Sequence, residues 1–303
     1  MTDPSSPRLL VTGASGHLGR RVVELLLSAG VPSVSAASRY PDKIFELAAR
    51  GAPLRRADFD DPASLDEAFV GVDRLLLIST DALGTPGQRQ RQHKTAVDAA
   101  VRAGVKHIVY TSMVNPDPNS PIPFAPDHLA TEQAIESSGI PYTILRVNWY
   151  AEYFFVSLPP ALRFGKMLTS AGEGRTAYVA RDDVARAAAA ALRSATEQSN
   201  RLDITGPQAV TAAEVVECVN TIFGTDIKLV PVSDKVLGET LTGSGMPGSL
   251  VELVVAMERN SREGRVEGVS DAVERLTGKP PTSLADFLIG HRLDLLLASK
   301  NSQ

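Results

Sequence analysis

Along the first half of the chain, short continuous runs of apolar residues alternate with longer segments in which apolar residues recur at helical spacing. Short apolar runs that end in turn residues predict strands buried on both faces, and segments with apolar residues at helical spacing predict helices between them. The expected strands cover 9–11, 34–38, 54–59, 75–78, 107–111 and 142–145. The expected helices cover 18–29, 41–51, 61–71, 88–103 and 127–138. Strands that alternate with helices at this spacing predict an α/β fold with a doubly wound parallel sheet.

The pattern changes after Asn148. An apolar and aromatic segment over 152–164 precedes an alanine-rich helix that begins near Arg181, and residues 211–223 form a helical pattern with a capping box. Residues 231–275 have a helical pattern that glycines interrupt. We therefore expect two parts, an α/β domain over 1–150 and a smaller, mostly helical domain over 151–303 that carries the substrate site and partly interleaves with the first.

A glycine-rich turn joins the first expected strand to the first expected helix. Gly13 permits a tight turn, Gly16 permits close approach of a pyrophosphate, and Gly19 permits the helix to pack against the strand. The free N–H groups and positive dipole at the helix N-terminus attract a phosphate. The turn therefore predicts a dinucleotide site, with its neighbours Ser15, His17 and Leu18 as further contacts. The alternative is a purely structural turn.

The end of the second strand indicates which dinucleotide binds. Ser38 and Arg39 occupy the place where a carboxylate would bind the ribose of NAD, and the chain has no carboxylate between Glu24 and Asp42. A guanidinium there suits the 2′-phosphate of NADP, and Lys43 adds positive charge. We therefore expect NADP(H), the alternative being a solvated surface arginine.

Further cofactor contacts are expected where the next two strands end, because these carboxyl ends face the cofactor crevice. Asp58 is placed to meet the adenine amino group, unless it only caps a helix, and Phe59 lies beside it. Ser79 and Thr80 follow the fourth strand.

Composition narrows the class of protein and of partner. The 303 residues are 43% hydrophobic and 22% charged, as in ordinary globular proteins, and the formal net charge of −4 argues against nucleic-acid binding. One cysteine, Cys218, allows no disulfide framework, and scattered histidines suggest no metal site. Without an apolar signal or a membrane-length run, we expect a cytoplasmic protein with a small-molecule partner. A homo-oligomer is compatible with all of this.

The helix after the fifth strand lacks a pair of residues found in typical short-chain dehydrogenases. Those enzymes carry Tyr-x-x-x-Lys, whereas this chain has His128 and Glu132 at the same spacing. Together with the glycine turn, the segment His-Leu-Ala-Thr-Glu over 128–132 and the segment Gly-Ile-Pro-Tyr-Thr-Ile-Leu-Arg over 139–146 resemble the atypical, NmrA-like short-chain reductases. The resemblance spans about 8–288 and is strongest to the branch of type 2 quinone oxidoreductases and triphenylmethane dye reductases.

This resemblance implies a Rossmann-type fold and direct hydride transfer from NADPH to a quinone or similar conjugated, aromatic acceptor. Such acceptors take hydride without a positioned acid, whereas a ketone needs one. His128 and Tyr150 are the candidate catalytic groups, although His128 could equally be structural. Asn148, Trp149 and Tyr150, with His128, are candidate substrate contacts, the alternative for Trp149 and Tyr150 being aromatic core at the domain junction. Val147 stands where the branch tends to have asparagine, which comes one position later at Asn148. Met246 lies in a glycine-rich loop, 243–248, expected between helices and either covering a ligand or merely connecting.

Two other functions fit the same residues. The chain could be a non-catalytic NADP(H) sensor, since NmrA-like relatives include redox-responsive regulators. It could also be a ketone or imine reductase of secondary metabolism. Turnover of NADPH distinguishes the sensor from both enzymes.

Overall fold

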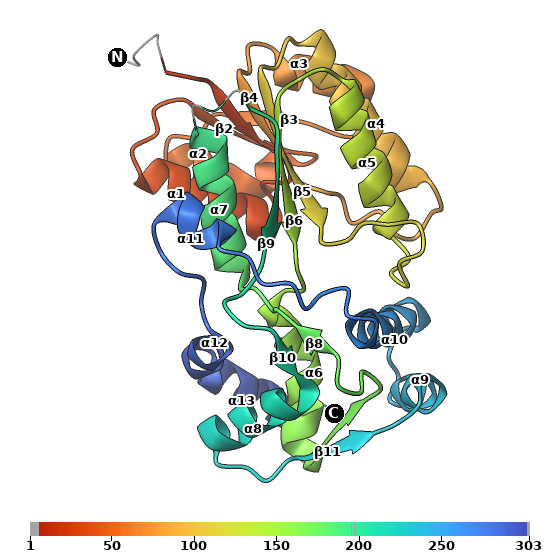
Figure 1. The fold of residues 1–303 in the computed structure, drawn as a ribbon. Coiled ribbons are helices and arrows are strands. Elements are labelled where there is room, and N and C mark those ends of the chain that lie inside the picture. The colour runs from red at the N-terminus through yellow and green to blue at the C-terminus, as the bar shows by residue number, and fades with distance from the viewer. Residues whose placement is uncertain (1–5, 195, 197, 302–303) are drawn as a thin grey trace.

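The computed structural model describes residues 6–194, 196 and 198–301, which form a larger α/β lobe and a smaller lobe beneath it (Figure 1). The α/β lobe is built on a seven-stranded sheet in the order β3-β2-β1-β4-β5-β6-β9, in which every neighbouring pair is parallel. These strands are β1 (Leu9–Val11), β2 (Val34–Ser38), β3 (Leu54–Arg56), β4 (Arg74–Leu77), β5 (His107–Met113), β6 (Tyr142–Val147) and β9 (Asn200–Ile204). The order reverses at β1, which is the switch point of a doubly wound sheet.

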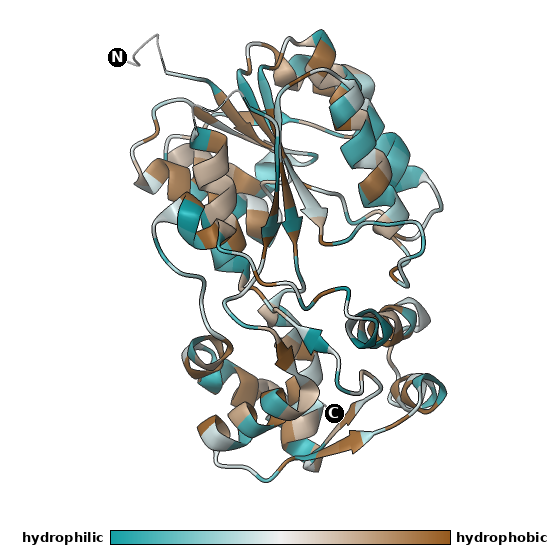
Figure 2. Cartoon of the chain, in the orientation of Figure 1, coloured by the Kyte–Doolittle hydropathy of each residue, from teal (hydrophilic) through white to brown (hydrophobic). Residues whose placement is uncertain are grey.

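Helices cover both faces of this sheet. One face packs against helices α1 (His17–Ser28), α2 (Phe45–Ala49), α7 (Arg181–Arg193) and α11 (Ala272–Thr277). The other packs against α3 (Pro62–Phe69), α4 (Gln88–Arg102) and α5 (Ala125–Ser137). Figure 2 shows long hydrophilic stretches along α4 and α5, whose outer faces meet solvent. A short 3-10 helix, Pro41–Ile44, leads into α2.

Two segments of the α/β lobe come from the second half of the chain. Helix α7 and strand β9 return from the small lobe, and Ala272 and Val273 of α11 join the same core. The sequence pattern did not predict β9. It is an edge strand whose Arg201 and Asp203 are polar and of which only Ile204 is buried, so it lacks the apolar run of the inner strands.

The third strand is shorter than its apolar pattern predicts. It ends at Arg56 rather than at Phe59. A carboxylate oxygen of Asp58 accepts the backbone N–H of Asp60 at 3.1 Å, and the N–H of Asp61 donates to the carbonyl of Asp58 at 2.9 Å. These bonds form a turn and turn the chain out of the sheet, which makes the extension to Phe59 wrong.

The small lobe is mainly helical. Its helices are α6 (Phe154–Phe164), which follows a 3-10 turn at Ala151–Tyr153, α8 (Ala212–Phe223), α9 (Asp234–Gly243), α10 (Gly248–Arg262), α12 (Leu284–Gly290) and α13 (Arg292–Asn301). Two small sheets pair β7 (Lys166–Thr169) with β11 (Lys228–Pro231), and β8 (Arg175–Thr176) with β10 (Val210–Thr211). Thr211 and Glu214 form the expected capping box. Among the described residues, no helix has the length and apolar character needed to cross a bilayer.

Candidate functional site

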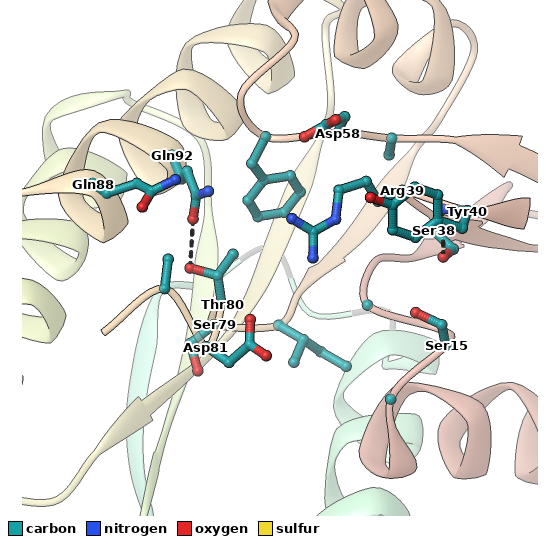
Figure 3. Close-up of a pocket in the computed structure, with 16 residues that line it drawn as sticks. Ser15, Ser38, Arg39, Tyr40, Asp58, Ser79, Thr80, Asp81, Gln88 and Gln92 are labelled. Atoms are coloured by element: carbon teal, nitrogen blue, oxygen red, sulfur yellow. Dashed lines mark hydrogen bonds between the residues drawn. The ribbon is translucent and has the colours of Figure 1, made fainter. Parts of the chain in front are cut away.

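A pocket of about 490 Å³ lies where the carboxyl ends of β1, β2, β3 and β4 meet (Figure 3). We call it the nucleotide pocket, after the site that the sequence predicts at this edge of the sheet. The structure brings nine of the predicted cofactor residues together in its wall: Gly13, Ser15, Gly16, Ser38, Arg39, Asp58, Phe59, Ser79 and Thr80. His17, Leu18, Gly19 and Lys43, also predicted, are not among its lining residues.

The glycine turn forms one side of this pocket. Gly13 has a φ of +62°, which favours glycine, and its carbonyl accepts the N–H of Gly16 at 2.9 Å. A Cβ atom on Gly19 would overlap the backbone of Gly13, whereas one on Gly16 would meet only the Gly13 carbonyl oxygen at 3.4 Å. Gly19 is therefore required for packing. The protein itself leaves room beside Gly16, which agrees with a requirement imposed by a ligand.

The N-terminus of α1 is free to bind an anion. Gly16 is the N-cap and supplies no side-chain hydrogen bond to the first turn. The N–H groups of this turn are the ones that an α-helix leaves without an internal partner, and they carry the positive end of the helix dipole. Their position beside the pocket fits a pyrophosphate.

The hydroxyl of Thr12, the residue directly after β1, ties the end of β1 to the end of β4. The side chain of Thr12 donates to the carbonyl of Leu76 at 2.9 Å and accepts the N–H of Ile78 at 3.0 Å. Thr12 thereby fixes the end of β1 against the end of β4. The segment after β4 is tied to β5 in the same way, because the N–H of Ser79 donates to Oγ1 of Thr111 at 3.0 Å.

Arg39 is an exposed cation at the pocket. Figure 3 shows its guanidinium extending into the pocket from the end of β2. Among the described residues, no carboxylate forms an ion pair with it, and its guanidinium carbon lies 5.4 Å from the ring centroid of Tyr40. The Lys43 ammonium lies 4.9 Å from the same ring. Two cations therefore flank Tyr40 at the place where a 2′-phosphate would add negative charge.

Further lining residues were missed from the sequence. Tyr40, Ala57, Ile78, Asp81, Ala82, Gln88 and Gln92 also line the pocket. Thr80 donates to Oε1 of Gln92 at 2.8 Å, and Nε2 of Gln92 donates to Asp60 at 2.8 Å. Gln88 and Gln92 are four residues apart on α4 and therefore share one face of that helix. The helix follows the loop after β4, whose carboxyl end faces the crevice, and this position is the sequence signal for the two side chains.

His128 lies in a buried hydrogen-bonded network behind this pocket. Its Nε2 accepts from the guanidinium of Arg89 at 2.8 Å, so its Nδ1 carries the proton and donates to the Tyr110 hydroxyl at 2.9 Å. The ring of His93 packs edge-on against Tyr110, and its Nδ1 lies 2.8 Å from Oγ1 of Thr131. Burial, and then the charge of Arg89, lower the pKa of His128 well below its ordinary value.

Glu132 is also taken up by internal bonds. Its carboxylate accepts from Ser112 at 2.6 Å and from two nitrogens of Arg146 at 3.0 and 2.6 Å. Only 1% of its side chain is exposed. Glu132 therefore joins α5 to β5 and β6, and the spacing it shares with His128 places neither side chain in the wall of the nucleotide pocket.

The other predicted substrate contacts lie outside the nucleotide pocket. Asn148 is buried and bonds to the carbonyl of Val266 at 2.9 Å. Burial raises the pKa of Tyr150 to about 12, and the Arg181 guanidinium lies 5.2 Å from its ring centroid. Trp149 lines a small cavity of about 30 Å³, and Met246 lines a larger one in the small lobe. Residues 244–247 connect α9 to α10, as expected of this loop.

Comparisons with known proteins identify the family and the class of cofactor. The model of the NAD(P)H-binding family matches residues 13–195. The chain is 35% identical to quinone oxidoreductase 2 of Escherichia coli strain K12, over 92% of this chain and 96% of that protein. The structure of an Escherichia coli NADPH-dependent quinone oxidoreductase with NADPH superposes with a TM-score of 0.88 at 34% identity, covering 94% of this chain and 99% of that one.

A dye reductase has the same fold. Triphenylmethane reductase of Citrobacter sp., solved with NADP(H), superposes with a TM-score of 0.86 at 32% identity, and the match covers 93% of this chain and 99% of that one. The fold and these relatives lead to one assignment. The chain belongs to the NAD(P)H-binding family, among the atypical NmrA-like short-chain reductases that its motifs resemble, and is an NADPH-dependent oxidoreductase.

Proposed function

We propose that this reductase transfers hydride from NADPH to a quinone or similarly conjugated aromatic acceptor, without a protein acid. One observation carries the proposal. The positions of the usual Tyr-x-x-x-Lys pair hold His128 and Glu132, and both are buried and engaged in internal hydrogen bonds. A substrate that needs no positioned proton donor suits such a site.

The cofactor residues fit NADPH. The N–H groups at the start of α1 and the open backbone at Gly16 suit the pyrophosphate, and Arg39 suits the 2′-phosphate. Asp58 lies in the wall where it can accept from the adenine amino group. Bound there, NADPH supplies the hydride. The protein holds donor and acceptor together.

The proton balance is simple for a quinone. Hydride addition gives a hydroquinone monoanion, and one proton from solvent completes the hydroquinone as NADP⁺ is released. An aliphatic ketone would give a far more basic alkoxide, which requires an acid close to its oxygen. The neutral, internally bonded imidazole of His128 supports a quinone rather than a ketone as the acceptor. The quinone and dye reductases among the relatives support the same choice.

The test is a screen of NADPH oxidation, followed by the fall in its absorbance, with one acceptor of each class. A naphthoquinone and a triarylmethyl dye should be reduced, whereas a simple ketone and a cyclic imine should react at least about a hundredfold more slowly, the low end of what general acid catalysis contributes. Fast reduction of the ketone would contradict the proposal. Tight binding of NADPH with no turnover of any acceptor would favour the sensor.

A further inference from the structure

A second cavity, of about 600 Å³, lies in the small lobe between α6, β7, α9 and α10. Its wall is largely apolar and includes Val156, Phe164, Leu237, Leu241, Met246 and Val254. It shares no lining residue with the nucleotide pocket. The volume is typical of a site for a small organic molecule.

Apolar surface at this cavity is left uncovered by the protein. Phe164 is 68% exposed and Val156 is 45% exposed, although both lie on α6 and line the cavity. Helix α9 has only Leu237 buried, so the rest of its inner face, including Leu241, remains accessible. Contiguous apolar surface of this kind indicates a partner or a ligand.

Positive charge lies at the rim of the cavity. Arg163 and Lys166 line it and are exposed, and among the described residues neither pairs with a carboxylate. Lys166 also sits in register with Lys228 on the neighbouring strand. Lys228 pairs with Asp226 at 2.5 Å, which leaves the charge on Lys166 uncompensated. A bound anion would supply the countercharge that Lys166 lacks.

The carboxylate of Glu258 carries negative charge at the inner, less exposed end of the cavity. One carboxylate oxygen of Glu258 accepts from Oγ1 of Thr169 at 2.6 Å and from the N–H groups of Ser170 and Ala171 at 2.8 and 2.9 Å. Glu258 lines the cavity and is fixed by these bonds. An anion is therefore repelled from the inner end and attracted to the rim.

We propose that this cavity binds a small amphipathic anion, with its alkyl or aromatic body between α6 and α9 and its anionic group between Arg163 and Lys166. Burial of the body supplies most of the affinity, and the two cations select the charge. The proposal goes beyond the reductase activity and does not depend on which acceptor takes the hydride.

Three probes with the same chain and different head groups test the charge selection. Decanoate, 1-decanol and decylammonium are titrated below their micelle concentrations into the full chain saturated with NADPH, and binding is followed by calorimetry. We expect decanoate to bind about tenfold more tightly than decanol, and decylammonium to bind most weakly, because exposed ion pairs contribute modestly. Equal affinities for the three probes would overturn the proposal.

Variants locate the site. Arg163→Glu combined with Lys166→Glu should abolish the preference for decanoate, and Thr240→Trp should block all three probes by filling the cavity from α9. The matched control is Arg193→Glu with Lys279→Glu, two exposed cations outside this wall, and it should leave decanoate affinity unchanged. Unchanged NADPH affinity and circular dichroism show that each variant is folded.

Three results would contradict the inference. A preference for decanoate over decanol that survives the charge reversal would mean that the rim cations do not select the anion. Displacement of decanoate by NADPH would place it in the nucleotide pocket. Dimerisation in sedimentation equilibrium that Thr240→Trp disrupts, without binding of any probe to the parent, would identify the occupant as a second copy of the chain.

Discussion

The guanidinium of Arg89 lies 2.8 Å from Nε2 of His128, and both side chains are buried. Arginine has no acceptor and keeps its charge, so the imidazole must accept at Nε2 and stay neutral. Among the described residues, no group accepts a hydrogen bond from the Nε of Arg89, and its guanidinium carbon lies 5.3 Å from the ring centroid of Phe124. A positive charge held against His128 in this way opposes any role in which the imidazole must become protonated.

We therefore predict that His128→Ala changes the rate of quinone reduction by less than about threefold. Removal of a used general acid would cost about 10²–10⁴-fold instead. Steady-state kinetics with saturating NADPH measures this, and Tyr150→Phe, the other candidate donor, should behave in the same way. A loss of two orders of magnitude in either variant, with NADPH affinity unchanged, would identify that side chain as the acid.

The same substitution should destabilise the protein. Loss of the imidazole leaves the buried guanidinium of Arg89 without its acceptor, which costs about 1–3 kcal/mol of unfolding free energy. Urea unfolding measures this, and the double variant Arg89→Met with His128→Ala should be less destabilised than the sum of the two single variants. Strict additivity would show that the two side chains do not interact.

Buried histidines should make stability fall in mild acid. Burial lowers the pKa of His93 to about 3 and that of His107 to about 4, and it lowers the pKa of His128 as well. In the unfolded chain these groups titrate near 6.5, so the unfolded state binds protons first as the pH falls. Stability from this source is complete above about pH 6.5 and is lost from there down towards pH 4 and 3.

Urea unfolding at pH 7.5 and 5.5 measures this effect. Each neutral histidine removes about 1.4 kcal/mol per pH unit once the pH is below 6.5. His107 is not in the wall of the nucleotide pocket, and its Nδ1 has no hydrogen-bond partner in the part of the chain that the structure describes. His107→Leu should therefore reduce the slope by the contribution of one histidine. A slope unchanged in that variant would show that His107 is not neutral in the folded protein.

Arg39 should set the preference for NADPH over NADH. Arg39→Asp is expected to weaken NADPH binding by about 10–100-fold, the range of one charge-assisted hydrogen bond or two, with little change for NADH. Lys43→Asp is the matched comparison, because Lys43 flanks the same Tyr40 ring but is not part of the pocket wall, and its effect should be smaller. Equal affinities of the parent for both cofactors would refute the role of Arg39.

The sequence pattern predicts well where local rules act alone. Leu75–Leu77 is buried on both sides, so its apolar run identifies β4, and the glycines identify the turn before α1. The sequence pattern does not predict strand β9, because a single buried residue, Ile204, produces no apolar periodicity. The buried position of His128 is accompanied by a hydrogen bond to Arg89, which is 39 positions away in the sequence. Sequence spacing on α5 cannot reveal such a contact.

Valine should have different effects at Gly16 and Gly19, the two glycines of the turn to which the pattern assigns different roles. Gly16 has φ −85° and ψ 164°, an extended conformation that valine adopts readily, and its Cβ would meet only the Gly13 carbonyl oxygen at 3.4 Å. Gly16→Val should therefore leave the melting temperature nearly unchanged but abolish NADPH binding, because its methyl groups would fill the space beside the α1 N-terminus. Gly19→Val should instead lower the melting temperature strongly, since its Cβ would overlap the Gly13 backbone.

Thermal melting with and without NADPH measures both effects in one experiment. NADPH should raise the melting temperature of the parent but not that of Gly16→Val, because only a folded chain that binds NADPH is stabilised by it. If folded Gly16→Val still melts at a higher temperature with NADPH, the pyrophosphate does not lie at this turn. If Gly19→Val melts like the parent, the helix is not held against the turn as closely as the structure places it.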